Sequence, residues 1–134
     1  AFGAAFSVTP DIALVLEGTT AADLPDMPPH KRVCAPGKGP VVPYMDGGTA
    51  YDREFFELLR SLAEQGRIPW QTKEYLSGGT DASAIQRSKA GVRVAGIAAA
   101  VRYLHTPSSV ASLEDCNHML ALARRFLQAV ATMA

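Results

Sequence analysis

Hydrophobic and polar positions along the chain predict an alternation of strands and helices. Residues 12–16 (IALVL) form a continuous apolar run between Pro10-Asp11 and Glu17-Gly18, which is the pattern of a strand buried on both faces. Residues 92–101 (VRVAGIAAAV) form a second apolar run, which begins after Gly91. We therefore expect two buried strands in the core of a sheet.

Two longer segments have helical spacing and recognisable ends. Residues 51–66 begin near Asp52 and end at Gly66, which can cap a helix. The segment 112–115 (SLED) resembles a capping box, and the helix that it opens is expected to run to the C-terminus. Apolar side chains form one stripe along each helix: Phe55, Leu59 and Leu62 in the first, and Met119, Leu122, Ala123, Phe126 and Val130 in the second.

The rest of the chain has weaker signals. Residues 19–39 are rich in proline and are expected to form an extended loop. Residues 40–45 could form a strand, but Pro43 has no amide donor and would restrict it to a sheet edge or a bulge. We also expect a strand over 68–75, a turn over 76–81 and a short helix over 82–89. Strands that alternate with helices imply crossover connections, so an α/β fold with a mostly parallel sheet covered by helices is predicted.

Composition and charge narrow the class of protein. Of the 134 residues, 48% are hydrophobic, which is enough for one globular domain with an ordinary core. Thirteen Lys and Arg balance thirteen Asp and Glu, so there is no basic field to attract nucleic acid. No apolar stretch approaches the ~20 residues that span a bilayer, and the two cysteines form no Cys-x-x-Cys pair. We expect one domain in the cytoplasm, without a nucleic-acid or membrane partner.

Two possible metal ligands follow the predicted buried strands. Glu17 comes directly after the strand over 12–16, and His105 comes just after the strand over 92–101. Ligands gather at the carboxyl ends of strands in open α/β sheets, and carboxylate with imidazole suits zinc, cobalt or manganese. A catalytic zinc needs about three protein ligands, so two residues do not complete a site. The alternatives are a helix-capping or loop-pairing carboxylate for Glu17 and a hydrogen-bonded histidine at a strand end for His105.

The segment Gly78-Gly79-Thr80-Asp81 has two interpretations. It could be a strand-to-helix turn, in which the glycines permit positive φ and Thr80 or Asp81 caps the helix. Alternatively, the glycines let a substrate backbone approach, with the helix N-terminus facing negative or developing charge. Cys34 follows two basic residues that could lower its thiol pKa, or it is simply a small thiol in a loop.

Several segments together resemble the C-terminal half of the catalytic domain in the glutamyl aminopeptidase and cellulase M-like family, the tetrahedral metalloaminopeptidases. They occur in the same order as in that family and with matching spacing, over nearly the whole chain. Four such motifs together are far more specific than any one of them. The segments are 10–25 (PDIALVLEGTTAADLP), 37–40 (GKGP), 78–82 (GGTDA), and 102–107 (RYLHTP) with 112–115 (SLED).

The resemblance implies a fold, an activity and site residues. The fold is a three-layer α/β/α arrangement around a mostly parallel mixed sheet, with residues 1–134 as a single, partial domain. The activity is that of a cytoplasmic aminopeptidase that uses two divalent metal ions, zinc or cobalt, to remove N-terminal residues from peptides. Glu17 would bind one metal and His105 the other, and Gly78–Asp81 would line the substrate cleft. Members of the family assemble into homo-oligomers, typically dodecamers.

The sequence also departs from the family pattern. Members use an upstream histidine and aspartate and a pair of consecutive glutamates, one a metal ligand and the other the general base, and this sequence has none of these. We therefore expect no catalytic residue in this chain and a requirement for the missing N-terminal part of the same protein. The chain alone should be inactive and bind metal weakly, and its exposed sheet edge could support a non-native dimer.

Two other functions remain open from the sequence. The chain could be a non-enzymatic binding or assembly module that keeps the fold without the chemistry. It could also belong to an endoglucanase-type glycoside hydrolase, which needs two carboxylates flanking the scissile bond. Glu17 and Asp81 can be nominated for those carboxylates, but nothing in their spacing supports the pairing.

Overall fold

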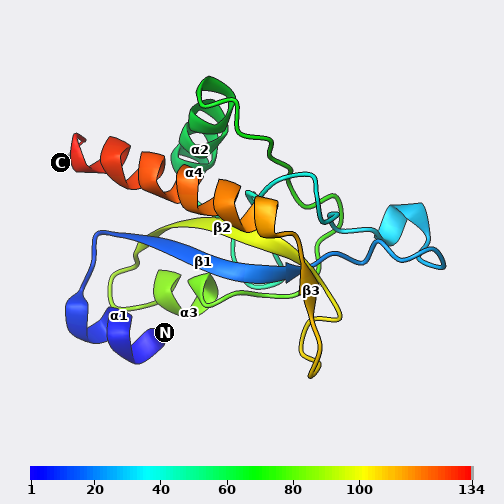
Figure 1. Ribbon diagram of the computed structural model, residues 1–134. Helices are drawn as coiled ribbons and strands as arrows, with labels where there is room; N and C mark the ends of the chain where they lie inside the picture. Colours follow the sequence, from blue (N-terminus) through cyan, green and yellow to red (C-terminus); the bar gives the residue numbers. More distant parts are fainter. Residues whose placement is uncertain (134) are drawn as a thin grey trace.

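A three-stranded mixed sheet lies at the centre of the computed structural model, which describes residues 1–133 (Figure 1). Strand β1 (Ile12–Thr20) runs parallel to β2 (Arg93–Arg102), and the short β3 (Val110–Ala111) pairs antiparallel with the other edge of β2. All of residues 94–101 in β2 are buried, which confirms the second predicted buried strand. Alanine and glycine dominate this segment, so elements on both faces can pack closely against it.

Strand β1 differs from its prediction in length and burial. It extends to Thr20, because the parallel pairing with β2 continues to Val101. Only Val15 and Thr19 of this strand are buried, and Leu16 is 46% exposed. The prediction of a strand buried on both faces is therefore wrong. The reason is that β1 is an edge strand in the described part of the chain, with a neighbour on one side only.

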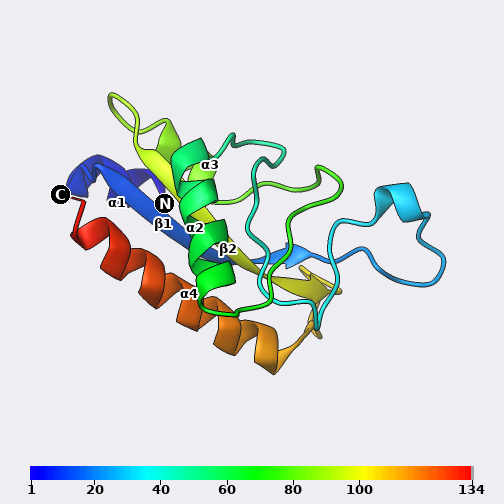
Figure 2. The same ribbon diagram turned by 90° about the horizontal axis from the view of Figure 1, so that it is seen from above.

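Helices cover both faces of the sheet and form a three-layer α/β/α arrangement. Helices α2 (Arg53–Gln65) and α4 (Leu113–Ala131) lie together on one face, whereas α1 (Phe2–Val8) and α3 (Ala82–Gln86) lie on the opposite face (Figures 1 and 2). This arrangement confirms the predicted fold class. The helix α1 was not predicted, and α3 ends three residues earlier than expected.

The main core forms between β2 and the helices α2 and α4. The rings of Phe55 and Phe126 meet edge to face, with their centroids 5.4 Å apart. Leu59 and Leu122 are buried in the same cluster, which also includes Ile97 of β2. The apolar stripes predicted for these two helices therefore face the sheet, as expected for amphipathic helices.

The predicted N-terminal ends of α2 and α4 are also present, whereas α4 stops at Ala131, before the C-terminus to which it was expected to run. The Asp52 carboxylate accepts a hydrogen bond from the Phe55 amide, and the Ser112 hydroxyl accepts one from the Asp115 amide. The capping box at 112–115 is only half formed, however. The Asp115 side chain instead accepts hydrogen bonds from the amides of Gly37 (2.7 Å) and Gly39 (2.9 Å). These donors satisfy the carboxylate, which is buried and would otherwise lack partners.

Isolated bridges are found in place of two predicted strands. Val41 pairs with Gln71 and with Ala98 through isolated bridges, so neither 40–45 nor 68–75 forms a strand. The proline-rich segment forms the expected loop, interrupted by a 3₁₀ turn (Pro29–Lys31), and it projects beyond the carboxyl end of β1 (Figures 1 and 2). No helix within residues 1–133 has the length and apolarity needed to cross a membrane.

Candidate functional site

Glu17 lies within β1, opposite Ala98 of β2, rather than after the strand as predicted. Its side chain is half-buried and reaches the turn that precedes α3. Oε1 of Glu17 accepts a hydrogen bond from the backbone amide of Asp81, at 2.9 Å. The structure thus brings together two predicted site segments that are 64 residues apart in the sequence. The loop-pairing alternative for Glu17 is therefore real, but it uses only one carboxylate oxygen. Within residues 1–133 the other oxygen accepts no hydrogen bond.

The turn that contacts Glu17 is held in place by a buried carboxylate. Asp46 is 5% exposed, and its Oδ1 accepts hydrogen bonds from the amides of Gly48 and Thr49. Its Oδ2 accepts hydrogen bonds from the hydroxyls of Tyr51 (2.9 Å) and Thr80 (3.2 Å). The two hydroxyl oxygens are also 2.7 Å apart. The loop 46–51 therefore fixes the position of Thr80 and, through it, of the neighbouring amide that binds Glu17.

Tyr51 joins this network to the sheet. Burial raises the pKa of its phenol well above the ordinary value, so the hydroxyl is neutral and can donate a hydrogen bond at physiological pH. Its ring lies so close to Gly96 of β2 that a Cβ on that glycine would be 2.7 Å from the ring. Sequence analysis did not select Asp46 or Tyr51. The one available signal was Gly96 inside the apolar run of β2, because a glycine within a strand often marks the close approach of another group, here the Tyr51 ring.

The space beside Glu17 is small in this chain. A depression of about 10 Å³ is lined by Glu17, Tyr51 and Thr80, together with Lys73. The Lys73 ammonium donates a hydrogen bond to the Ser77 carbonyl at 3.1 Å and so also holds the turn. This volume is close to the minimum that a single water molecule requires. A complete substrate pocket is therefore not formed by the described residues alone.

His105 lies in the connection between β2 and β3, which projects from the sheet (Figure 1). The residue is exposed and has φ of 63°, and Tyr103 has φ of 59°. Its ring makes no hydrogen bond to other described residues, so the alternative of a hydrogen-bonded histidine is not observed. In the sheet register, Glu17 lies opposite Ala98 of β2. His105 follows Ala98 by seven residues along the chain. Within residues 1–133, no group of three or more His, Cys, Asp or Glu side chains could hold a metal ion.

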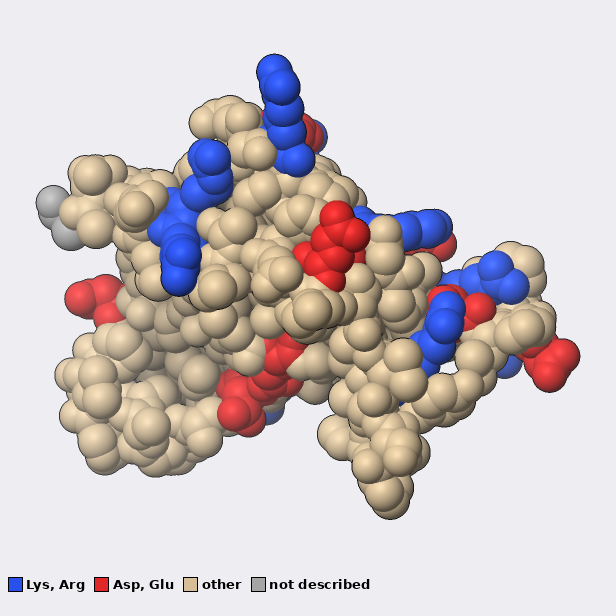
Figure 3. Space-filling model, viewed as in Figure 1, with Lys and Arg blue, Asp and Glu red and all other residues tan. Residues whose placement is uncertain are grey.

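One face of the molecule shows side chains of both signs of charge. Basic and acidic side chains are interspersed on the face shown in Figure 3, without an extended patch of one sign. This distribution agrees with the zero net charge of the sequence.

Residues 1–122 match the family model described as M42 glutamyl aminopeptidase. The chain belongs to this family. The resemblance based on the motifs at 10–25, 37–40, 78–82 and 102–107 is thereby confirmed. The M42 match includes Glu17, His105 and the turn 78–81.

Similar proteins of known structure share the fold of this M42 chain. An aminopeptidase from the archaeon Desulfurococcus kamchatkensis is 34% identical, with a TM-score of 0.88 over 92% of this chain and 36% of that chain. The TET1 peptidase of Pyrococcus horikoshii is 27% identical, with a TM-score of 0.75 over 92% of this chain and 34% of that chain. Among relatives compared by sequence alone, a lysyl aminopeptidase of Pyrococcus furiosus is 28% identical over 131 residues, which are 97% of this chain and 36% of the relative. The chain thus spans about a third of the length of these relatives.

The donor atoms of this M42 chain fit a divalent metal in kind but are too few to complete a site. Glu17 has a carboxylate oxygen free of hydrogen bonds, and both ring nitrogens of His105 are free among the described residues. Carboxylate and imidazole are ordinary ligands for zinc and cobalt. Further ligands are needed in addition to these two side chains.

Proposed function

We propose that this chain is the C-terminal part of a metal-dependent aminopeptidase that removes N-terminal residues from peptides through a dinuclear metal centre. The observation that carries the proposal is the contact between Glu17 and the Asp81 amide, in a chain of the M42 family. This contact orients a half-buried carboxylate and leaves one of its oxygens available.

In this proposal, Glu17 holds one divalent ion and His105 holds the other. Two bound ions, zinc or cobalt, supply Lewis-acid polarisation of the scissile carbonyl and an activated water. The other described residues of this chain contribute by holding the Glu17 carboxylate in one orientation. The Asp81 amide fixes the rotation of the Glu17 carboxylate, and the buried Asp46 carboxylate fixes the turn that carries this amide.

The turn Gly78-Gly79-Thr80-Asp81 is proposed to bind the substrate backbone. Gly78 has φ of 68°, a conformation that side chains rarely adopt. A Cβ built on Gly78 or Gly79 would meet no atom within 4 Å, so the space beside both residues is open. Open space next to a fixed turn supports the interpretation that a peptide lies along it.

The remaining parts of the active site are proposed to come from the rest of the enzyme. They include the other metal ligands and the general-base glutamate, so a polypeptide of residues 1–134 should bind metal weakly and have no turnover. We further propose a homo-oligomeric enzyme in the cytoplasm, in line with the P. horikoshii relative, which assembles into a tetrahedron or a large octahedral shell. The free edge of β1 can pair with another copy when the chain is alone, and such a dimer would not be native.

A chimeric enzyme tests the proposed function. Residues 1–122 would replace the matched segment of the D. kamchatkensis aminopeptidase, and hydrolysis of aminoacyl anilides would be measured with zinc or cobalt. We expect turnover, and we expect Glu17→Gln and His105→Gln each to lower kcat/KM by more than the roughly 10- to 100-fold typical of outer-shell residues.

Matched variants provide the controls for the chimera. Glu57→Gln alters an exposed residue that is paired with Arg60, and His30→Gln alters an exposed residue in the proline-rich loop. Both variants should retain full activity. A folded chimera in which the Glu17 and His105 variants are as active as these controls would contradict the assignment.

A further inference from the structure

The connection between β2 and β3, residues 103–109, contains two strained residues, one of which is the proposed metal ligand His105. Tyr103 has φ of 59° and His105 has φ of 63°, in the left-handed region that side chains rarely adopt. The hydroxyls of Thr106 and Ser109 both donate hydrogen bonds to the Tyr103 carbonyl, at 2.7 and 3.2 Å. A strained backbone persists only where the surrounding structure holds it. The contacts that hold this connection therefore also hold His105.

The same connection is joined to β1, the strand that carries Glu17. Directly after the paired strands, the Ala21 amide donates a hydrogen bond to the Val101 carbonyl at 3.0 Å. Leu104 is half-buried, and a Cβ built on Gly18 of β1 would lie 3.6 Å from Cδ1 of this leucine. The connection that carries one proposed ligand thus packs against the strand that carries the other.

An ion pair extends this link beyond the backbone. Arg102, the last residue of β2, donates two hydrogen bonds to the Asp23 carboxylate, from Nε at 2.8 Å and from Nη2 at 2.6 Å. These hydrogen bonds lower the pKa of the Asp23 carboxyl, so the pair is ionised at physiological pH. The Asp23 side chain is only 11% exposed. A two-point contact to a largely buried carboxylate fixes orientation as well as distance, which most exposed ion pairs do not.

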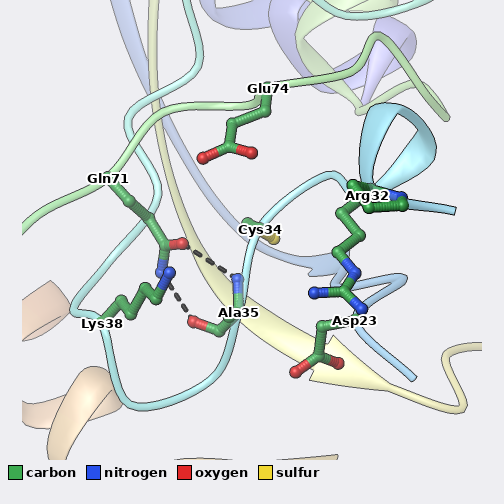
Figure 4. A pocket seen from close by; sticks show the side chains of 8 residues that line it. Asp23, Arg32, Cys34, Ala35, Lys38, Gln71 and Glu74 are labelled. Atoms are coloured by element: carbon green, nitrogen blue, oxygen red, sulfur yellow. Dashed lines mark hydrogen bonds between the residues drawn. The ribbon is translucent and has the colours of Figure 1, made fainter. Parts of the chain in front are cut away.

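A second arginine lies near Asp23 without pairing with it. Figure 4 shows the Arg32 guanidinium on the same side of the loop as the Asp23 carboxylate. Among the described residues, however, the ion pair of Asp23 is with Arg102, and Arg32 Nε donates only a long hydrogen bond to the Met27 carbonyl at 3.4 Å. Arg32 belongs to the same proline-rich loop as Asp23, so it does not join that loop to β2.

We propose that Asp23 and Arg102 are positioning residues, which hold the connection 103–109, and with it His105, in place relative to β1. Arg102 directly precedes Tyr103, the first strained residue, so its anchored side chain fixes the direction in which the chain leaves β2. The pair also lies at the point where the backbone pairing of β1 and β2 has ended. The role of His105 in this inference rests on the proposed function, whereas the ordering of the connection does not depend on a metal ion.

NMR of the metal-free 134-residue protein tests the proposal through the ¹⁵N relaxation of residues 103–109. We expect Arg102→Gln and Asp23→Asn each to lower the ¹⁵N heteronuclear NOE of these residues. The double variant should behave like either single variant, because both residues act through one contact. The Asp81 amide, which reports on the contact with Glu17, should keep its chemical shift. A general loss of structure would move this amide as well.

Arg32→Gln is the matched control, because it removes a positive charge near Asp23 without breaking a hydrogen bond to it. It should leave residues 103–109 as ordered as before. In a zinc titration, Arg102→Gln should raise the dissociation constant at the His105 ring about tenfold, the lower end of the range for groups that orient a ligand. Arg32→Gln should leave this constant unchanged.

Three results would overturn the positioning role. The first is that residues 103–109 stay ordered in Arg102→Gln, and the second is that Arg32→Gln disorders them equally. The third is that zinc binds His105 as tightly in Arg102→Gln as in the unaltered chain. A His105 ring that does not respond to zinc in the unaltered chain would instead refute the proposed metal ligand, and the relaxation data would still decide whether the pair holds the connection.

Discussion

At the scale of single residues, Asp46 is the group on which the candidate site depends most. Its buried carboxylate accepts two backbone and two hydroxyl hydrogen bonds, and these link the loop 46–51 to the turn that contacts Glu17. A buried carboxylate is tolerated only when its acceptors are satisfied, so removal of one donor should be costly.

The variant Tyr51→Phe tests this dependence, because it removes one hydroxyl donor and keeps the ring against Gly96. We expect the free energy of unfolding to fall by about 1–3 kcal/mol, the cost of leaving a buried polar group without its partner. Urea denaturation provides the measurement.

Tyr44→Phe is the matched control for Tyr51→Phe. Tyr44 is 49% exposed, and its hydroxyl makes no hydrogen bond to other described residues. This variant should leave the urea midpoint unchanged. Equal midpoints for the two variants would show that the Asp46 network adds nothing to stability.

At the scale of elements, local signals were sufficient for the two long helices α2 and α4, but not for the short helix α1 or for the edges of the sheet. Asp52 and Ser112 cap their helices as predicted, because a cap depends on residues within one turn. The burial of β1 and the absence of a strand over 68–75 depend on which segments pair in space. Likewise, Asp115 looked like part of a capping box, but its carboxylate binds loop amides 76 and 78 residues away.

The packing of α4 on α2 and β2 leads to a prediction at this scale. Phe126 is fully buried against Phe55, so Phe126→Ala should destabilise the fold by about 3–5 kcal/mol through lost burial and a residual cavity. Leu127→Ala alters the next residue, which is 54% exposed, and should cost far less. Thermal or urea unfolding of both variants measures the difference. A similar loss for both would mean that α4 packs through a different face.

At the scale of the whole molecule, the motifs predicted the family. They predicted only some of the contacts between distant segments. Glu17 and the turn 78–81 do meet, as expected for residues that line one site. The strand register, which places Glu17 opposite Ala98 within β1, could not be read from an apolar run that ends one residue earlier. Asp46 and Tyr51 were missed, because their role depends on the fold and not on a motif.

The central claim is that Glu17 and His105 are metal ligands in an aminopeptidase centre to which this chain contributes only a part. The most direct measurement is a zinc titration of the 134-residue protein, followed by NMR of the His105 ring and of the Asp81 amide that reports on Glu17. We predict weak binding with shifts at both positions, loss of the Asp81 shift in Glu17→Gln, and no effect of Glu57→Gln. The chain has two other histidines, His30 and His118, and zinc that shifts only these rings would contradict the account. So would an equal shift of the Asp81 amide in Glu17→Gln and in the unaltered chain.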